Sequence, residues 1–281
     1  MTLKSVPLAS PLKVSKTFMP WNWAMAGVLL GTLVTLLMFA PAQWLAQAVA
    51  LASQDRLQLQ EARGTVWQGS AQVVLTGGTG SRDAQALPGR IAWTLRPFAS
   101  ADQLSLRSEC CMPTPMQLSF SPAWDGGQLR VSDTPSTWPA ALLTGLGAPW
   151  NTLQPEGDLA IVPQQLSLNF QNGRWLTQGR LQLTARHMAS RLSPLKPIGS
   201  YQVELSPAAV GAGAGAPVGA IDLKLSTVSG SLLLSGQGQW LGQRLRFQGE
   251  ASAAPEHEAA LNNLLNIIGR RQGARSLLSW G

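Results

Sequence analysis

Residues 159–183 read LAIVPQQLSLNFQNGRWLTQGRLQL, and this stretch decides the fold class. Its apolar side chains recur at alternate positions, as in Leu166, Leu168 and Phe170, with polar residues between them. Alternation with period two predicts strands that have one apolar and one wet face. The dipeptide Asn172-Gly173 separates two such runs and is typical of a tight antiparallel hairpin. We therefore predict two half-buried strands joined by a short turn.

The same alternation extends over most of the chain, in about a dozen segments. Turn signals rich in Gly, Pro and Asp separate these segments, and charged residues make up only 12% of the chain. This pattern predicts an all-β fold, a mainly antiparallel and curled meander whose apolar sides gather inward. The segments include Leu57/Leu59, Val73/Leu75, Ile91/Trp93/Leu95, Leu104/Leu106, Met116/Leu118/Phe120, Leu129/Val131, Tyr201/Val203/Leu205, Ile221/Leu223/Leu225, Leu232/Leu234 and Leu245/Phe247.

Two short helices are expected within the meander. Ser136 to Leu143 contains a cap residue and a proline in the first turn. Near the end, Pro255 opens a second helix that has an apolar stripe and stops at Gly269. The stripe consists of Leu261, Leu264, Leu265 and Ile268. We expect this helix to cover an open end of the sheet.

An apolar anchor precedes the strands. Residues 17–54 carry no ionisable side chain, and Ala24 to Ala42 are long enough to cross a hydrocarbon layer. Lysines precede this segment without any acidic residue, which favours a cytoplasmic N-terminus. We predict a cytoplasmic tail over 1–20, a transmembrane helix over 21–45 and an exported β-rich domain over 53–281. The chain is thus expected to be a single-pass membrane protein.

A cleaved signal peptide is the alternative, because Ala40-Pro41-Ala42 has the small-x-small form of a cleavage site. The long region before the apolar core, and the length of that core, favour an uncleaved anchor. In both cases, the part of the chain that follows the apolar segment is exported from the cytoplasm.

Charge excludes one class of partner. The net charge is +7, yet no run of Lys and Arg with interleaved aromatic residues exists, so nucleic-acid binding is not expected. Arg270, Arg271 and Arg275 form a basic cluster near the C-terminus. Two readings stay open for this cluster, namely complementation of a helix end and contact with anionic lipid headgroups.

The sequence provides no recognisable catalytic, cofactor-binding or metal site, and we expect no enzyme. His187 and His257 are the two histidines and lack ligand spacing, and the motifs of serine enzymes are missing. Aspartates are expected in turns, except Asp222, which should face the polar side of its strand. The glycines of residues 210–217 lack the context of a nucleotide-binding loop. The turn aspartates are Asp83, Asp102, Asp125, Asp133 and Asp158.

Cys110 and Cys111 are adjacent, so a bond between them needs a distorted backbone. Export to an oxidising compartment permits such a bond, and the oxidation state stays open. Eight tryptophans in the exported part either pack in the core or form a docking surface. They are Trp67, Trp93, Trp124, Trp138, Trp150, Trp175, Trp240 and Trp280.

The order of several motifs resembles the type II secretion system protein N family (GspN). Residues 64–69, Gly-Thr-Val-Trp-Gln-Gly, resemble the Gly-x-Val-Trp-x-Gly opening of that family, and residues 91–97 resemble its Trp-x-Leu-x-Pro element. The segments 192–201 and 230–236 and the helix at 261–269 follow in order. The Ala/Gly loop 210–217 and the cysteine pair depart from the family pattern.

The resemblance implies a non-enzymatic accessory component of the machine that exports folded proteins from the periplasm of Gram-negative bacteria. Such proteins lie in the inner membrane, and the resemblance implies that the β-rich domain over 53–281 is periplasmic. The other platform subunits of the inner membrane are therefore the expected partners. Two alternatives stay open. A lipid-handling protein would hold acyl chains in a trough lined by Leu104, Leu118, Leu168 and Leu183. A cleaved, soluble enzyme would need converging carboxylates or a paired His187.

Overall fold

The computed structural model describes residues 21–97, 102–124, 126–171, 174–208, 219–241 and 244–281. The chain divides into two compact units, Met1–Phe39 and Ala40–Gly281, which are described separately. The predicted tail 1–20, Asp125, the turn Asn172-Gly173 and the Ala/Gly loop 210–217 lie outside the described residues.

The first unit contains helix α1 (Trp21–Met38). All of its residues are exposed, and its 18 residues give a length of about 27 Å. Among the described helices it is the one that is long and apolar enough to cross a membrane. The hydroxyls of Thr32 and Thr35 donate to the carbonyls of Val28 and Gly31, so they suit an apolar environment.

The structure ends this helix earlier than the predicted range 21–45. A second helix, α2 (Ala42–Ala52), begins after Pro41, which lies in an extended conformation. Proline interrupts the helix because it has no N–H and disfavours a helical conformation of the preceding residue. The Ala40 carbonyl instead accepts a hydrogen bond from the Val66 N–H at 2.9 Å, and α2 contacts the first strand. The β-rich unit thus begins at Ala40 and not at the predicted residue 53.

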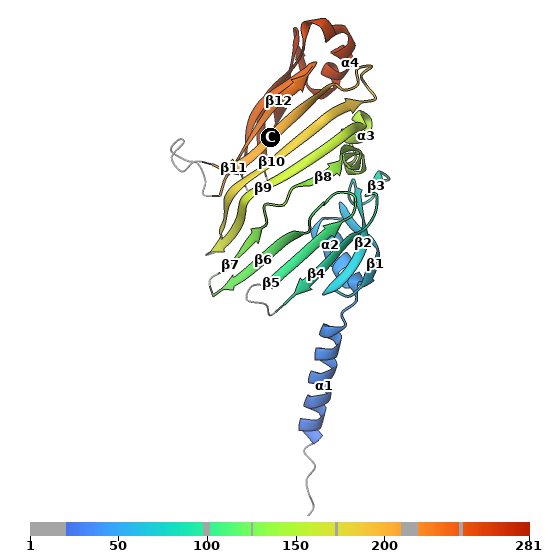
Figure 1. The fold of residues 1–281 in the computed structure, drawn as a ribbon, viewed down its shortest axis with the longest axis vertical. Coiled ribbons are helices and arrows are strands. Elements are labelled where there is room, and N and C mark those ends of the chain that lie inside the picture. The colour runs from blue at the N-terminus through green and yellow to red at the C-terminus, as the bar shows by residue number, and fades with distance from the viewer. Residues whose placement is uncertain (1–20, 98–101, 125, 172–173, 209–218, 242–243) are drawn as a thin grey trace, which may run out of the picture. The chain divides into compact units, whose positions relative to one another are not determined.

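Within the described residues, the second unit is built on one antiparallel sheet of 16 strands. Figure 1 shows the ribbon of this unit. The sheet order is β1-β2-β4-β5-β6-β7-β9-β10-β11-β12-β13-β14-β16-β15, with β3 beside β2 and β8 beside β9. The strands are β1 (Leu57–Gly64), β2 (Gln68–Thr76), β3 (Ala84–Ala86), β4 (Ile91–Arg96), β5 (Asp102–Ser108), β6 (Met116–Ala123), β7 (Gly126–Val131), β8 (Ser136–Pro139), β9 (Pro155–Gln171), β10 (Arg174–Ser190), β11 (Gly199–Pro207), β12 (Ile221–Gly230), β13 (Leu232–Leu241), β14 (Arg244–Ala253), β15 (Arg270–Gln272) and β16 (Arg275–Trp280).

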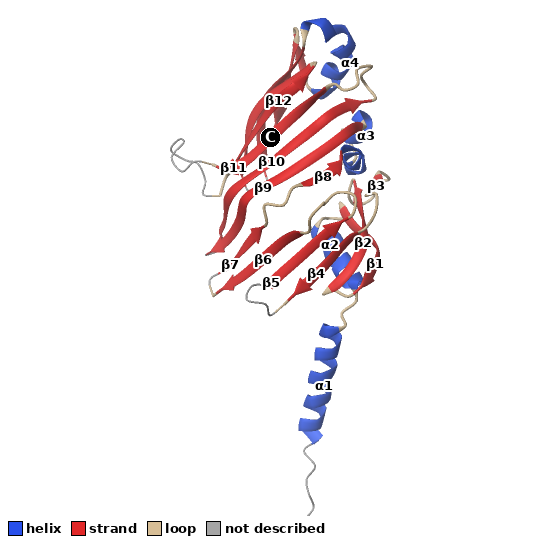
Figure 2. Cartoon of the chain, viewed as in Figure 1, coloured by secondary structure: helices blue, strands red, loops and turns tan. Residues whose placement is uncertain are grey.

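This topology confirms the all-β, mainly antiparallel meander (Figure 2). The sheet is open, because its order begins at β1 and ends at β15. It is also curled. Leu57 of β1 and Leu183 of β10 line the same cavity, although six strands (β2, β4, β5, β6, β7 and β9) lie between them in the order.

The strand register places apolar residues on one face, called here the inner face. Trp93 pairs with Leu106, Leu104 with Leu118, and Ile161 with Leu183. Cross-strand partners project to the same side of a sheet, so these pairs form continuous apolar rows. On the outer face, polar partners such as Glu204 and Lys224 lie opposite each other.

The two motifs at residues 64–69 and 91–97 contact each other. The first forms the turn between β1 and β2, and its Val66 carbonyl accepts a hydrogen bond from Trp93 Nε1 at 3.0 Å. A side chain on Gly69 would lie 2.6 Å from the Trp93 ring, so this position needs glycine. Trp93 is buried together with Ala42 and Ala71, and this cluster attaches the start of α2 to the sheet.

The predicted helix at Ser136 to Leu143 starts later than expected. Ser136–Pro139 form strand β8, and a 3-10 helix η1 (Ala140–Leu146) follows. The extended start is stabilised by pairing of Trp138 with Leu159 in β9. A short helix α3 (Trp150–Leu153) comes next.

The C-terminal helix agrees with its prediction. A 3-10 turn η2 (Pro255–His257) leads into α4 (Glu258–Ile268), whose Leu261, Leu264 and Leu265 are buried. These side chains pack against Tyr201, Leu232 and Ala251 of the sheet. Helix α4 therefore fills the inner face of the C-terminal strands, as the apolar stripe indicates.

Candidate functional site

The N-terminal half of the inner face is hollow. A cavity of about 600 Å³ lies between α2, η1 and the strands. It is open to solvent on part of its boundary, and all of its lining residues are Leu, Ile, Val or Trp. They are Leu45, Val49, Leu57, Leu59, Val73, Leu75, Leu87, Ile91, Trp93, Leu104, Leu106, Trp138, Leu142, Leu143, Leu159, Ile161 and Leu183.

Regular secondary structure positions this lining. Leu45 and Val49 are four residues apart on α2, so they lie on one side of that helix. On the strands, alternate residues face the cavity, as Leu57 and Leu59 do on β1 and Leu104 and Leu106 do on β5. The cavity wall thus combines one helix face with the inner face of a curled sheet.

The chemistry of the wall is that of a hydrocarbon surface. Among the described residues, no polar atom contributes surface to the cavity. The two indole N–H groups are bonded elsewhere, Trp93 Nε1 to the Val66 carbonyl and Trp138 Nε1 to Ser136 Oγ at 2.9 Å. The cavity therefore offers dispersion contacts and no hydrogen bonds to a ligand.

Two of the four residues predicted to line a lipid trough, Leu104 and Leu183, line this cavity. Leu118 and Leu168 do not line it. Leu118 pairs with Leu104, so it belongs to the same inner face, and Leu168 pairs with Leu129 of β7. Both are half-buried, and the apolar rows continue beyond the cavity. Leu45 and Val49 were missed because their segment was assigned to the membrane, although Pro41 signalled a break.

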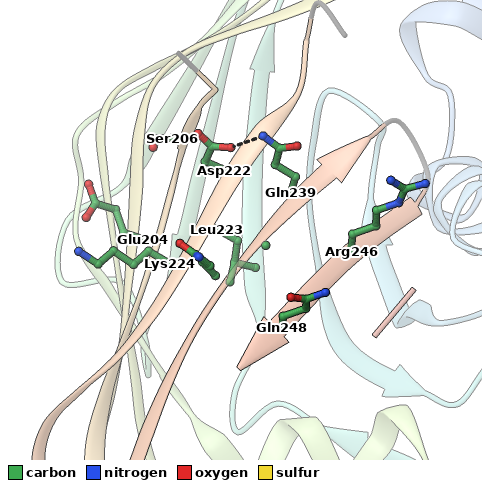
Figure 3. A pocket seen from close by; sticks show the side chains of 10 residues that line it. Glu204, Ser206, Asp222, Leu223, Lys224, Gln239, Arg246 and Gln248 are labelled. Carbon is green, nitrogen blue, oxygen red and sulfur yellow. Dashed lines mark hydrogen bonds between the residues drawn. The ribbon is translucent and has the colours of Figure 1, made fainter. Parts of the chain in front are cut away.

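The outer face of β11–β14 carries a different, polar hollow of about 540 Å³ (Figure 3). Gln239 Nε2 donates to Asp222 at 2.9 Å, and Glu204 lies 3.9 Å from Arg180. Asp222 thus faces the polar side, as predicted from the alternation. A carboxylate bonded to an amide is a structural contact, and we assign this hollow no catalytic role. The lining residues are Glu204, Ser206, Asp222, Leu223, Lys224, Gln237, Gly238, Gln239, Arg246 and Gln248.

Three of the other polar residues considered in the sequence, His187, Asp83 and Asp133, have structural contacts. The backbone N–H of exposed His187 donates to Ser200 Oγ at 3.1 Å, and His257 stands immediately before α4. Asp83 accepts a hydrogen bond from Asn151, and Asp133 accepts one from the Gln165 N–H. The expectation of a turn is wrong for Asp158, which is exposed on strand β9, and for Asp102, which begins strand β5. The side chain of Asp102 lies outside the described ones. Within the described part of the chain, no three His, Cys, Asp or Glu residues group as metal ligands.

The arginines near the C-terminus have acidic neighbours in space. Arg271 lies 3.8 Å from Glu258, and Arg275 lies 3.1 Å from Glu250. Their sequence neighbourhood lacks acids, so only the fold reveals these pairs. Both arginines thus form ion pairs within the β-rich unit, an arrangement that differs from complementation of a helix end and from headgroup contact.

Cys110 and Cys111 form a disulfide at the turn after β5. Cys111 is buried with Val73, Leu87 and Leu142, all of which line the cavity. The bond therefore lies next to the cavity wall. The sequence left open whether the two cysteines are oxidised, and in the structure they are bonded to each other.

The tryptophans divide between core and surface. Trp93 is buried, and Trp67 and Trp138 are half-buried. The side chain of Trp175 lies outside the described ones. Four others are exposed, so core packing does not apply to them and the docking-surface reading stays open. They are Trp124, Trp150, Trp240 and Trp280.

These features define a class of protein, in which one apolar helix of membrane-spanning length precedes an open, curled antiparallel sheet with an apolar inner face. The family model described as type II secretion system (T2SS), protein N, matches residues 55–277. The chain belongs to the type II secretion system protein N family, as its motifs predicted. Membership assigns it to type II protein secretion. Neither a curated protein nor a solved structure gave a significant match.

Proposed function

We propose that this chain is a non-enzymatic accessory subunit of the type II secretion system in the inner membrane. The observation that carries the proposal is the family match over residues 55–277 in a chain that also contains α1. Helix α1 anchors the protein, the lysine-bearing tail stays in the cytoplasm, and the β-rich unit lies in the periplasm. There it contacts other secretion components during the export of folded proteins across the outer membrane.

Exposed tryptophans at one end of the inner face support the proposal that the protein acts by contacting other proteins. Helix α4 buries Ala251 at one end of β14. At the other end, Trp240 pairs with Leu245 and Trp280 pairs with Phe247, on the same face. Trp240 is 42% exposed and Trp280 is 66% exposed. Exposed tryptophans on a rigid sheet suit the anchor positions of a protein interface.

Site-specific crosslinking in cells tests this proposal. A photoreactive amino acid replaces Trp240 or Trp280 in the full chain, within a strain that secretes a known substrate. We expect adducts with inner-membrane platform subunits of the secretion machine. The matched control carries the same amino acid at Gln239, which lies beside Trp240 on the opposite face. Equal adduct yields at all three positions, or adducts with unrelated proteins alone, would contradict the proposed interface.

Deletion of the gene tests the secretion role itself. We expect substrate to accumulate in the periplasm of the deletion strain and export to return when the full chain is supplied on a plasmid. Normal export in the deletion strain would contradict a required role.

A further inference from the structure

We propose that the apolar cavity beneath α2 binds one hydrocarbon chain of a membrane phospholipid. The site goes beyond the secretion role, and the assignment of its lipid source rests on the proposed membrane anchor α1. It consists of the inner faces of β1, β2, β4, β5, β9 and β10, covered by α2 and η1.

The first argument for a ligand is that apolar side chains lining the cavity remain partly exposed to water. Leu57, Leu104 and Leu183 are only half-buried, although they point into the middle of the unit. Their surface gains free energy from any apolar group that displaces water. The volume of about 600 Å³ falls in the range of ligand pockets. The C-terminal half shows the contrast, because α4 fills the same face there with Leu261, Leu264 and Leu265.

The wall selects for hydrocarbon over peptide. A protein segment would bring backbone N–H and C=O groups into the cavity, and each would need a hydrogen-bond partner. Among the described residues, the cavity wall presents no polar surface that could supply one. An acyl chain has no such groups, so it fills the cavity without this cost.

Chain connectivity identifies a membrane lipid as the source. Only residues 39–41 separate α1 from α2, and α2 contributes Leu45 and Val49 to the cavity wall. A chain whose helix spans the membrane is thus tethered to a lipid surface by a three-residue link. The apolar rows also continue from Leu104 to Leu118, and from Phe120 to Leu129, which leaves a path for further methylenes.

Photolabelling tests the site. The full chain is reconstituted in vesicles of phosphatidylethanolamine and phosphatidylglycerol that contain a phosphatidylethanolamine with a diazirine at one acyl end. After irradiation, labelled peptides are identified by mass spectrometry. We expect label on peptides from β1, β5, β9 and β10, in addition to label on α1.

A pair of variants on one strand makes the test specific. Leu183→Trp fills the cavity, whereas Gln182→Trp adds the same ring to the outer face. Each methylene excluded from an apolar site reduces affinity about fourfold. We therefore expect Leu183→Trp to reduce sheet labelling at least about tenfold, while Gln182→Trp and the α1 label stay unchanged. Circular dichroism checks that both variants keep their strands.

Several results would overturn the proposal. Label confined to α1 in the wild-type chain excludes an acyl chain in the cavity, whatever the variants do. Equal sheet labelling of wild type and folded Leu183→Trp places the lipid elsewhere. If Leu183→Trp does not fold, Ile161→Trp, on the paired position of β9, replaces it.

Discussion

Single glycines decide where aromatic rings fit on the inner face. Gly69 lies opposite Trp93 in the sheet, and a side chain there would also meet the carbonyl oxygens of Arg63 and Thr65. Gly127 leaves comparable room for the ring of Phe120. Because interiors are closely packed, even one methyl group must displace a ring or the backbone at such a position.

Gly69→Ala should lower the free energy of unfolding by about 1–3 kcal/mol, since the added methyl overlaps the Trp93 ring and nearby backbone. Denaturant unfolding of the purified full chain in detergent, followed by far-ultraviolet circular dichroism, measures the change. Gln68→Ala, at the neighbouring exposed position, is the control and should change stability little. Equal stability of Gly69→Ala and wild type would show that the site relaxes freely.

Tyr201 is the single tyrosine of the chain and is buried under α4. Burial raises the pKa of its hydroxyl above the ordinary value of 10.0. Among the described residues, the hydroxyl has no hydrogen-bond partner. Below pH 10.0 the group is neutral in both states. At higher pH the unfolded chain loses this proton first, so the stabilisation of the folded state declines as pH rises through the folded pKa.

Tyr201→Phe should raise the free energy of unfolding by about 1 kcal/mol at neutral pH, because it removes an unsatisfied buried hydroxyl. It should also weaken the loss of stability in alkali. Denaturant titrations at neutral and alkaline pH measure both effects, and ultraviolet difference absorbance follows the ionisation of this one tyrosine. A variant less stable than wild type at neutral pH would reveal a hydrogen bond to the hydroxyl.

At the scale of elements, the helices α2, η1 and α4 cover the inner face of the sheet. Helix α2 and η1 cover the N-terminal strands and leave a cavity, whereas α4 covers the C-terminal strands and leaves none of its three buried leucines accessible. The difference follows from the side chains available. Helix α4 places Leu261, Leu264 and Leu265 on one side, while α2 provides Leu45 and Val49 to the cavity.

Leu265→Ala in α4 should cost about 2–5 kcal/mol of stability, because it creates a cavity at a fully buried position. Ile267→Ala in the same helix is the matched control, since Ile267 is 45% exposed and should lose far less. Thermal unfolding of both variants provides the comparison. Similar losses in the two variants would contradict the view that packing of Leu265 on the sheet determines the effect, because alanine is the better helix former in both cases.

For the whole molecule, the proposed architecture is an anchor followed by a periplasmic body. The two units are compact on their own, and the link between α1 and α2 is short. The link contains Pro41, and Ala40 is held by Val66. We therefore expect α1 to function as a membrane anchor whose sequence is exchangeable, while the β-rich unit carries the specific contacts.

Replacement of α1 by an unrelated transmembrane helix should preserve export in a deletion strain, whereas replacement by a cleaved signal peptide should reduce it. The physical reason is that the tether keeps the body concentrated at the membrane. Substrate in the culture medium is measured, and alkaline carbonate extraction confirms the location of each protein. Extraction of the unmodified chain from membranes by carbonate would refute the anchor, and the cleaved signal peptide would then be favoured.

The sequence by itself determined the sheet, its apolar face, the helix α4 and the apolar helix α1. These features depend on local periodicity, which neighbouring residues such as Leu166, Leu168 and Phe170 display directly. The sequence also predicted Leu104 and Leu183 as residues of one apolar trough, because alternation assigns a face to each residue.

The tertiary structure alone decided which apolar surfaces are covered. It left a cavity between Leu45 and Leu183, paired Arg275 with Glu250 and exposed Trp240 and Trp280. Each of these depends on how far the sheet curls and which element packs on it. Such contacts join residues far apart in the chain, and local periodicity contains no information about them.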